Sequence, residues 1–165
     1  MASGDTLAIF SPQANEPPTS AYATFDVRNG ILVLDFDGAT SESAVFRGIL
    51  PGNYAGGGLT LDIYWMATSA TSGDVVWGGS IERAQAGGTD QDADSFATEQ
   101  LSAAVTTNAT SGIKNKSTIT FSSGANMDSL AAGEPFRLKI ARKPADAGDT
   151  MTGDAEFTEA VLKET

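Results

Sequence analysis

The sequence predicts an all-β protein, an antiparallel β-sandwich of jelly-roll type with at most one short helix. Apolar and polar residues alternate with a period of two in one segment after another, most clearly over residues 59–67. Gly, Pro, Asn and Asp separate these segments at short intervals, as turns between strands do. The length is typical of one domain, so residues 1–165 are expected to form a single sandwich.

Four strands are predicted in the first third of the chain. They are Thr6–Phe10, Ala21–Val27, Ile31–Phe36 and Ala44–Leu50. Asn29-Gly30 separates the second strand from the third, and both residues tolerate the positive φ angles of a two-residue hairpin turn. The third strand is apolar at both odd and even positions, so we expect it to be a central strand covered on both faces.

A hairpin is predicted over residues 58–83. Both of its strands alternate apolar and polar residues, and residues 70–74, Ala-Thr-Ser-Gly-Asp, supply the turn between them. Trp65 and Trp77 share the parity of the aliphatic positions, so both are expected in the core.

The second half of the chain continues the same pattern, with strands expected at about Thr98–Thr107, Ser117–Ser122, Pro135–Arg142 and Asp154–Lys163. The apolar positions of the last strand change from odd to even numbers, which predicts a β-bulge near Thr158–Glu159. Gly148 and Gly153 are expected to form the final hairpin turn. One helical segment is predicted over Asn126–Gly133, which begins at a capping residue and ends at a glycine.

Composition excludes several classes of function. The chain has no His and no Cys, which excludes disulfides, zinc sites, Cys or His nucleophile systems and Ser-His-Asp triads. Its 10 basic against 21 acidic residues give a net charge of −11, so nucleic acid would be repelled. No stretch has the character of a transmembrane helix or a signal peptide, and we expect a soluble product made in a cytoplasm with no membrane partner. The sequence singles out no catalytic, cofactor-binding or metal-ligating residue, and no cofactor is expected.

Four of the ten basic residues lie within one short segment, Arg137, Lys139, Arg142 and Lys143. One interpretation is a solvated strand face, along which long side chains keep their charges in water. The other is a contact patch for an acidic neighbour, such as another copy of this chain.

Acidic residues offer two further candidates. Asp90, Asp92 and Asp94 alternate as in a calcium loop, but an EF-hand needs Gly where Ser95 stands and Glu where Leu101 stands. A solvated acidic loop is therefore the leading interpretation, and an irregular calcium site is the alternative. A pair of carboxylates on strands would serve glycoside hydrolysis, and nothing singles out two among Asp35, Asp37, Glu42, Asp62 and Glu82.

Aromatic residues are candidates for contact with a sugar or a protein. Tyr64, Trp65 and Met66 would form a platform on a carbohydrate-binding sandwich, although the parity of Trp65 favours the core. Tyr54 lies in the glycine-rich segment 51–58, where no apolar period explains it, so it is predicted to be an exposed contact anchor.

The chain resembles a group of small phage- and prophage-encoded proteins over almost its full length, and four segments carry the resemblance: residues 54–60, 64–70, 133–138 and 148–154. The resemblance implies a jelly-roll virion component without enzymatic activity, most commonly a capsid decoration (cement) protein. Such a protein binds the outer surface of the shell formed by the major capsid protein, as a homotrimer on the virion. The matching motifs are turns and strand patterns, so no functional residue is carried over.

The alternative is a module on a phage tail or fibre that recognises a host carbohydrate or receptor. Segments 51–58 and 86–96 are the loops expected to bind it. An enzyme ranks third, because a metal-dependent hydrolase is hard to build without His.

Overall fold

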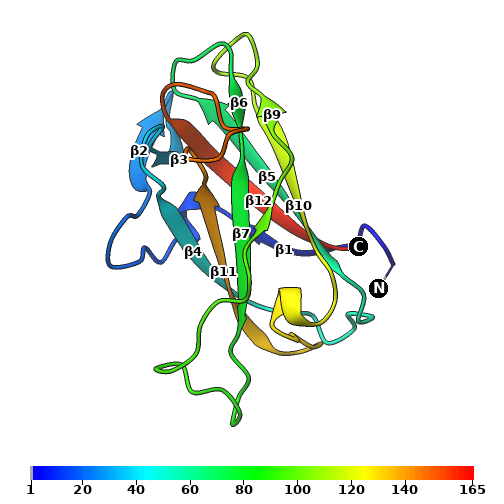
Figure 1. The fold of residues 1–165 in the computed structure, drawn as a ribbon. Helices are drawn as coiled ribbons and strands as arrows, with labels where there is room; N and C mark the ends of the chain where they lie inside the picture. Colours follow the sequence, from blue (N-terminus) through cyan, green and yellow to red (C-terminus); the bar gives the residue numbers. More distant parts are fainter. Residues whose placement is uncertain (1) are drawn as a thin grey trace.

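The computed structural model describes residues 2–165 as two antiparallel sheets packed face to face, with a small ladder at one end (Figure 1). Sheet A has the order β10-β5-β12-β3-β2, and β1 pairs with the second half of β12. Its strands are β1 (Thr6–Phe10), β2 (Thr24–Arg28), β3 (Ile31–Phe36), β5 (Leu59–Ala67), β10 (Asn115–Phe121) and β12 (Ala155–Glu164). Sheet B has the order β4-β11-β7-β8. Its strands are β4 (Ser43–Ile49), β7 (Trp77–Arg83), β8 (Gln100–Leu101) and β11 (Pro135–Arg142), and the small ladder joins β6 (Asp74–Val75) to β9 (Val105–Thr106).

The predicted all-β antiparallel sandwich is confirmed. Every ladder between these strands is antiparallel, and helical structure in residues 2–165 is confined to two 3-10 turns, η1 (Pro12–Ala14) and η2 (Ala125–Met127). The helix predicted over Asn126–Gly133 is wrong beyond its first turn. Asp128 and Ser129 adopt left-handed φ angles of 53° and 54°, which end the turn at once. None of these helical turns is long and apolar enough to cross a membrane.

Two local predictions are confirmed in the backbone. Asn29 and Gly30 have φ angles of 51° and 78° between the paired residues Arg28 and Ile31, which is a two-residue hairpin turn. The register of β12 against β5 shifts between Phe157 and Glu159, which is the predicted bulge.

β3 meets the prediction only in part. Val33 and Leu34 point to opposite faces of sheet A and both are fully buried, so the strand is covered on each face there. It lies beside the edge strand β2 rather than in the middle of the sheet.

The hairpin predicted over residues 58–83 is wrong, because β5 belongs to sheet A and β7 to sheet B. Trp65 and Trp77 are both in the core as predicted, with ring centroids 6.4 Å apart across the sandwich. A hairpin within one sheet and an arch between two sheets give the same alternation of apolar and polar residues, because each strand has one buried face in both cases. The final turn is also misassigned, since residues 143–154 cross from β11 in sheet B to β12 in sheet A.

The strand predicted over Thr98–Thr107 is broken into β8 and β9. Between them the Ser102 side chain accepts the Trp77 N–H at 3.0 Å, and the chain leaves sheet B for the small ladder. Tyr54 is likewise corrected. It is only 7% exposed, belongs to the core, and donates its hydroxyl to the Gly57 carbonyl, so it is no contact anchor.

A buried ion pair fixes the crossing between the sheets. Arg142 at the end of β11 and Asp149 have side chains 0% and 1% exposed, and their closest charged atoms are 2.8 Å apart. The same guanidinium donates to the carbonyls of Met151 and Gly153. Because the Arg142 guanidinium bonds Asp149, Met151 and Gly153, it holds this crossing segment against the end of sheet B.

Candidate binding site on the outer face of sheet B

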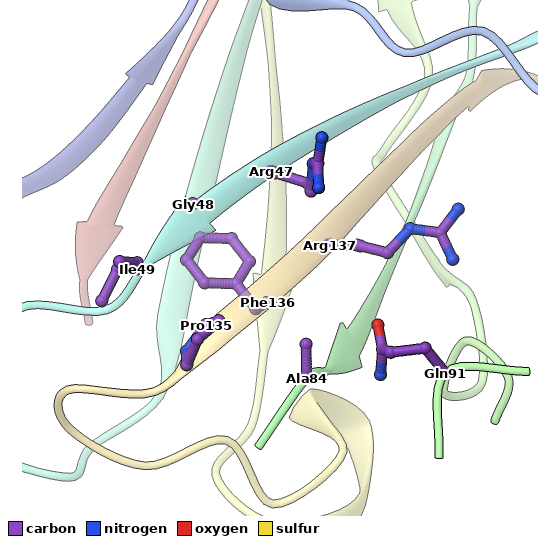
Figure 2. Close-up of a pocket in the computed structure, with 8 residues that line it drawn as sticks. All are labelled: Arg47, Gly48, Ile49, Ala84, Gln91, Pro135, Phe136 and Arg137. Atoms are coloured by element: carbon purple, nitrogen blue, oxygen red, sulfur yellow. The ribbon is translucent and has the colours of Figure 1, made fainter. Parts of the chain in front are cut away.

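Two arginines stand directly opposite each other on neighbouring strands of sheet B. Arg47 on β4 pairs with Arg137 on β11 in the antiparallel register, so both side chains leave the same outer face. They line a pocket of about 380 Å³ (Figure 2). The complete lining is Arg47, Gly48, Ile49, Ala84, Gln91, Pro135, Phe136 and Arg137.

The pocket has an apolar side made by the ends of β4 and β11. Ile49 is 65% exposed, and its register partner is Pro135. The ring of Phe136 lies beside Gly48, where an added Cβ would approach the ring to 2.8 Å (Figure 2). Because residue 48 is glycine, the Phe136 ring packs beneath β4. The ring therefore forms the floor of the pocket and is not exposed for stacking against a ligand.

A long loop, residues 84–99, supplies the opposite wall and extends beyond the end of the sandwich (Figure 1). Gln91 reaches from this loop toward Ala84 and β11 (Figure 2). The second half of the loop is anchored on sheet B, because the Phe96 ring lies 5.0 Å from Arg137 and 4.9 Å from the Lys139 ammonium. Loops of this length inside a compact domain are usually functional or disordered, and this one is held in place.

Each arginine of the pocket has one acidic partner. Arg137 Nη1 lies 2.8 Å from Oε2 of Glu82, a carboxylate that is 1% exposed. Arg47 Nε lies 2.5 Å from Oε1 of Glu16, and this pair is open to solvent. The other N–H groups of both guanidiniums make no hydrogen bond within the described chain. Like charges therefore stand opposite each other across this ladder, with N–H donors left over beside the pocket.

The predicted basic run is divided by the structure. Arg137 and Lys139 lie on the outer face of sheet B under Phe96, and Lys143 pairs with Glu99 at 2.8 Å. Arg142 is fully buried, so neither a solvated face nor a contact patch describes it.

The strand carboxylates proposed for glycoside hydrolysis are dispersed. Asp62 lies on the outer face of sheet A, where Lys163 Nζ is 2.6 Å away, whereas Glu82 lies on sheet B. Asp37 accepts the N–H groups of Ala39 and Thr40, which lower the pKa of its carboxyl, and Glu42 accepts the Asp37 N–H at 2.9 Å. The residues that line the pocket include no carboxylate, so paired-carboxylate chemistry has no place there.

Asp35 is the strand carboxylate with the largest electrostatic perturbation. Burial, together with the charges of Asp154 and Glu156, raises the pKa of its carboxyl from 3.8 to about 6. Thr68 donates to it at 3.3 Å. This group lies on sheet A, away from the pocket lining.

The aspartates of the acidic loop accept hydrogen bonds from backbone N–H groups of the same loop. Asp90 Oδ1 accepts the Asp92 N–H at 3.1 Å, and Asp94 Oδ1 accepts the Ser95 N–H at 2.9 Å. In residues 2–165 no three acidic side chains come together in a way that would hold a metal ion. The alternative of an aromatic platform at Tyr64, Trp65 and Met66 is not met, because Trp65 is fully buried, as its parity predicts, and Met66 is nearly so.

No protein-family model matches the chain, and no curated protein matches it. Several solved structures have a similar arrangement of strands. A xylan-binding CBM22-2 domain of Paenibacillus barcinonensis Xyn10C is 13% identical, with 95% of this chain and 91% of that chain covered at a TM-score of 0.47. The CBM22-1 and GH10 modules of a Clostridium thermocellum xylanase are 13% identical at a TM-score of 0.46, and 87% of this chain covers 24% of that one.

A chain of the infectious bursal disease virus structure is 11% identical at a TM-score of 0.41, with 99% of this chain and 34% of that chain covered. The fold rests on the sheets described above, and these weak likenesses add nothing about a ligand or partner. The resemblance to phage virion proteins therefore stays a prediction, as do the capsid partner, the homotrimer and the virion location.

Proposed function

We propose that this chain is a non-catalytic binding module that recognises an acidic carbohydrate in the pocket on the outer face of sheet B. The observation that carries the proposal is the placement of Arg47 opposite Arg137 above an apolar floor. In a chain of net charge −11, two of the ten basic residues are held together against their mutual repulsion. A bound anion relieves that repulsion.

A carboxylate is the anion that this geometry suits. A guanidinium presents its N–H groups in a planar fork that matches the two oxygens of a carboxylate. Glu16 takes only Nε–H of Arg47, and Glu82 only Nη1–H of Arg137, so both forks keep donors for a ligand.

A sugar ring fits the remaining surfaces of the pocket. Ile49 and Pro135 offer apolar contact to the C–H face of a ring, and the Gln91 amide can donate to and accept from hydroxyls. A volume of about 380 Å³ is at the small end for ligand sites, which favours recognition of one or two rings of a longer chain. Oligosaccharides of uronic or sialic acids combine both features.

The test is calorimetric titration of the chain with uronic-acid and sialic-acid oligosaccharides, against the same oligosaccharides with carboxylates reduced to alcohols. The carboxylate form should bind, and the reduced form should bind at least about tenfold more weakly, since a charged hydrogen bond is worth about 1.5–3 kcal/mol.

Arg47→Ala is the appropriate variant, because its partner Glu16 is solvent-exposed and removing the pair leaves no buried charge. It should weaken binding about ten- to hundredfold. Lys114→Ala is the matched control, since Lys114 forms a similar open pair with Glu159 at 2.6 Å but does not line the pocket. Equal affinity for acidic and reduced sugars, or equal loss in both variants, would contradict the proposal.

A further inference from the structure

The long loop beside the pocket is joined to the sandwich by backbone hydrogen bonds only at the two ends of residues 85–96. Ala84 N–H donates to the Pro135 carbonyl at 2.9 Å, and Ala97 N–H donates to the Ile81 carbonyl at 2.8 Å. Between these two points, the backbone groups of the described structure form hydrogen bonds only within the loop. The segment can therefore swing about its two ends without breaking either sheet.

The ring of Phe96 holds this segment on the outer face of sheet B. Phe96 is half-buried, yet it does not belong to the hydrophobic core. The ring lies on two cations instead, with Arg137 Cζ 5.0 Å and Lys139 Nζ 4.9 Å from its centroid. A cation–π contact at such a site is weaker than a hydrogen bond between opposite charges, so an anionic group can displace the ring.

Lys139 differs from the other basic residues of the chain. Within residues 2–165 the other nine lysines and arginines each form an ion pair with an Asp or a Glu, and Lys139 forms none. Of the acidic residues near it on sheet B, Glu82 is bound by Arg137 and Glu99 by Lys143. The side chain of Lys139 is half-buried, so an anion that binds its ammonium supplies a counter-charge that the described chain does not.

Lys139 and Arg137 leave the same face of β11, because they are two residues apart on one strand. A strand rises about 3.4 Å per residue, so Lys139 lies about 7 Å beyond Arg137, on the side away from Pro135 and the apolar part of the pocket. We propose that Arg137 and Lys139 form a second subsite beneath Phe96, which binds a second carboxylate of the same oligosaccharide once the ring is displaced. The inference rests on the function proposed above and narrows the ligand class to oligosaccharides with acidic groups on more than one ring.

Two oligosaccharides of equal length separate this subsite from the pocket: one with a carboxylate on every ring, and one with a carboxylate on its terminal ring alone. In calorimetric titrations Lys139→Gln should weaken binding of the first about tenfold and leave binding of the second unchanged. Lys143→Gln is the matched control, because it removes the same charge from a nearby position but its ammonium pairs with Glu99. It should change either affinity by less than about twofold.

Chymotrypsin reports on the displacement of the ring, because it cleaves after aromatic residues that its apolar pocket can reach. The oligosaccharide with many carboxylates should speed cleavage after Phe96 at least about threefold, whereas the one that fills only the pocket should not. Equal cleavage with both ligands, or equal affinity of Lys139→Gln and the parent chain, would overturn the second subsite and leave the pocket in place. If neither oligosaccharide binds the parent chain, the proposed function is wrong, and this inference with it.

Discussion

The outer faces of the two sheets handle charge in opposite ways. On sheet A two buried carboxylates are bound by bases: Asp62 lies near both Lys163 and Lys116, and Glu156 is bound by Arg28. Burial tends to raise the pKa of the Asp62 carboxyl, but hydrogen bonds from Lys163 and Thr118 outweigh it and hold that pKa below its ordinary value. On sheet B the arginines face each other, and their carboxylate partners occupy only one nitrogen of each.

The difference separates charges that stabilise the protein from charges available to a ligand. Sheet A binds the carboxylates of Asp62 and Glu156 with lysine and arginine side chains of its own. Sheet B keeps Arg47 exposed beside a pocket whose opposite wall is a loop that Phe96 anchors on Arg137. Substitutions on the two sheets test this division, and the largest effect is expected where one substitution destabilises both sheets.

Asp149→Ala should have the largest effect, because it leaves the fully buried Arg142 without its carboxylate. Removing one partner of a buried pair costs about 3–5 kcal/mol of unfolding free energy, measured here by urea denaturation. Asp146→Ala in the same crossing is the control, since the Asp146 carboxylate accepts the Gly148 N–H alone and its loss should cost about 1 kcal/mol. Similar costs for the two variants would contradict the account of the crossing.

Arg137→Ala and Arg47→Ala should differ in stability although both remove a pocket arginine. Arg137→Ala leaves the carboxylate of Glu82, which is 1% exposed, without its base and should lower the free energy of unfolding by about 3 kcal/mol. Arg47→Ala removes a solvent-exposed pair and should lower it by less than about 1 kcal/mol. Denaturation of both variants gives the comparison. Arg137→Lys should recover most of the loss, and equal stability of the two alanine variants would show that Glu82 does not depend on Arg137.

Phe96→Ala should release the loop over sheet B at a smaller cost. The two cation–π contacts of the ring are worth about 0.5–1 kcal/mol each at such sites. Limited proteolysis should cut within residues 84–99 faster in this variant, while Ile113→Ala in the loop before β10 should leave that rate unchanged. Unchanged cleavage in Phe96→Ala would mean that other contacts hold the loop.

The smallest effect concerns pH and sheet A. The pKa of Asp35 is raised to about 6 on folding, so the folded protein holds this proton more tightly than the unfolded chain. The contribution of this group to stability is therefore greatest below about pH 4 and is lost as the pH rises through 6. Asp35→Asn, which keeps an acceptor for Thr68, should be more stable than the parent at pH 7 and equal to it near pH 4. An equal difference at both pH values would contradict the raised pKa.

Local features of the fold could be predicted from the sequence because burial leaves a period of two. The bounds of β1, β3 and β5, the turn at Asn29-Gly30 and the bulge after Phe157 all follow from parity and turn chemistry. The sheet to which a strand belongs could not be predicted in this way. An arch between sheets and a hairpin bury the same face of each strand, and so residues 58–83 were misassigned.

The pocket could not be predicted, because its arginines meet only through the register of β4 with β11. In the sequence Arg47 is an isolated charge at a polar position of its strand, and Gln91 stands between aspartates that suggest an acidic loop. The burial of Tyr54 could not be predicted either, because no apolar period surrounds it. Its hydroxyl donates to the Gly57 carbonyl, and this local hydrogen bond allows the side chain to be buried. A search for basic residues at polar parity on strands that are to be paired would have found Arg47 and Arg137.

The most direct test of the central claim is a nuclear magnetic resonance titration of the full chain with a uronic-acid oligosaccharide. Backbone amide and arginine Nε–H signals report on both faces at once. Shifts are expected at the residues that line the pocket, among them Arg47, Ile49, Gln91 and Arg137, while Thr118 and Lys163 of sheet A stay unmoved. Shifts on sheet A, or none at saturating ligand, would contradict a carboxylate site on sheet B.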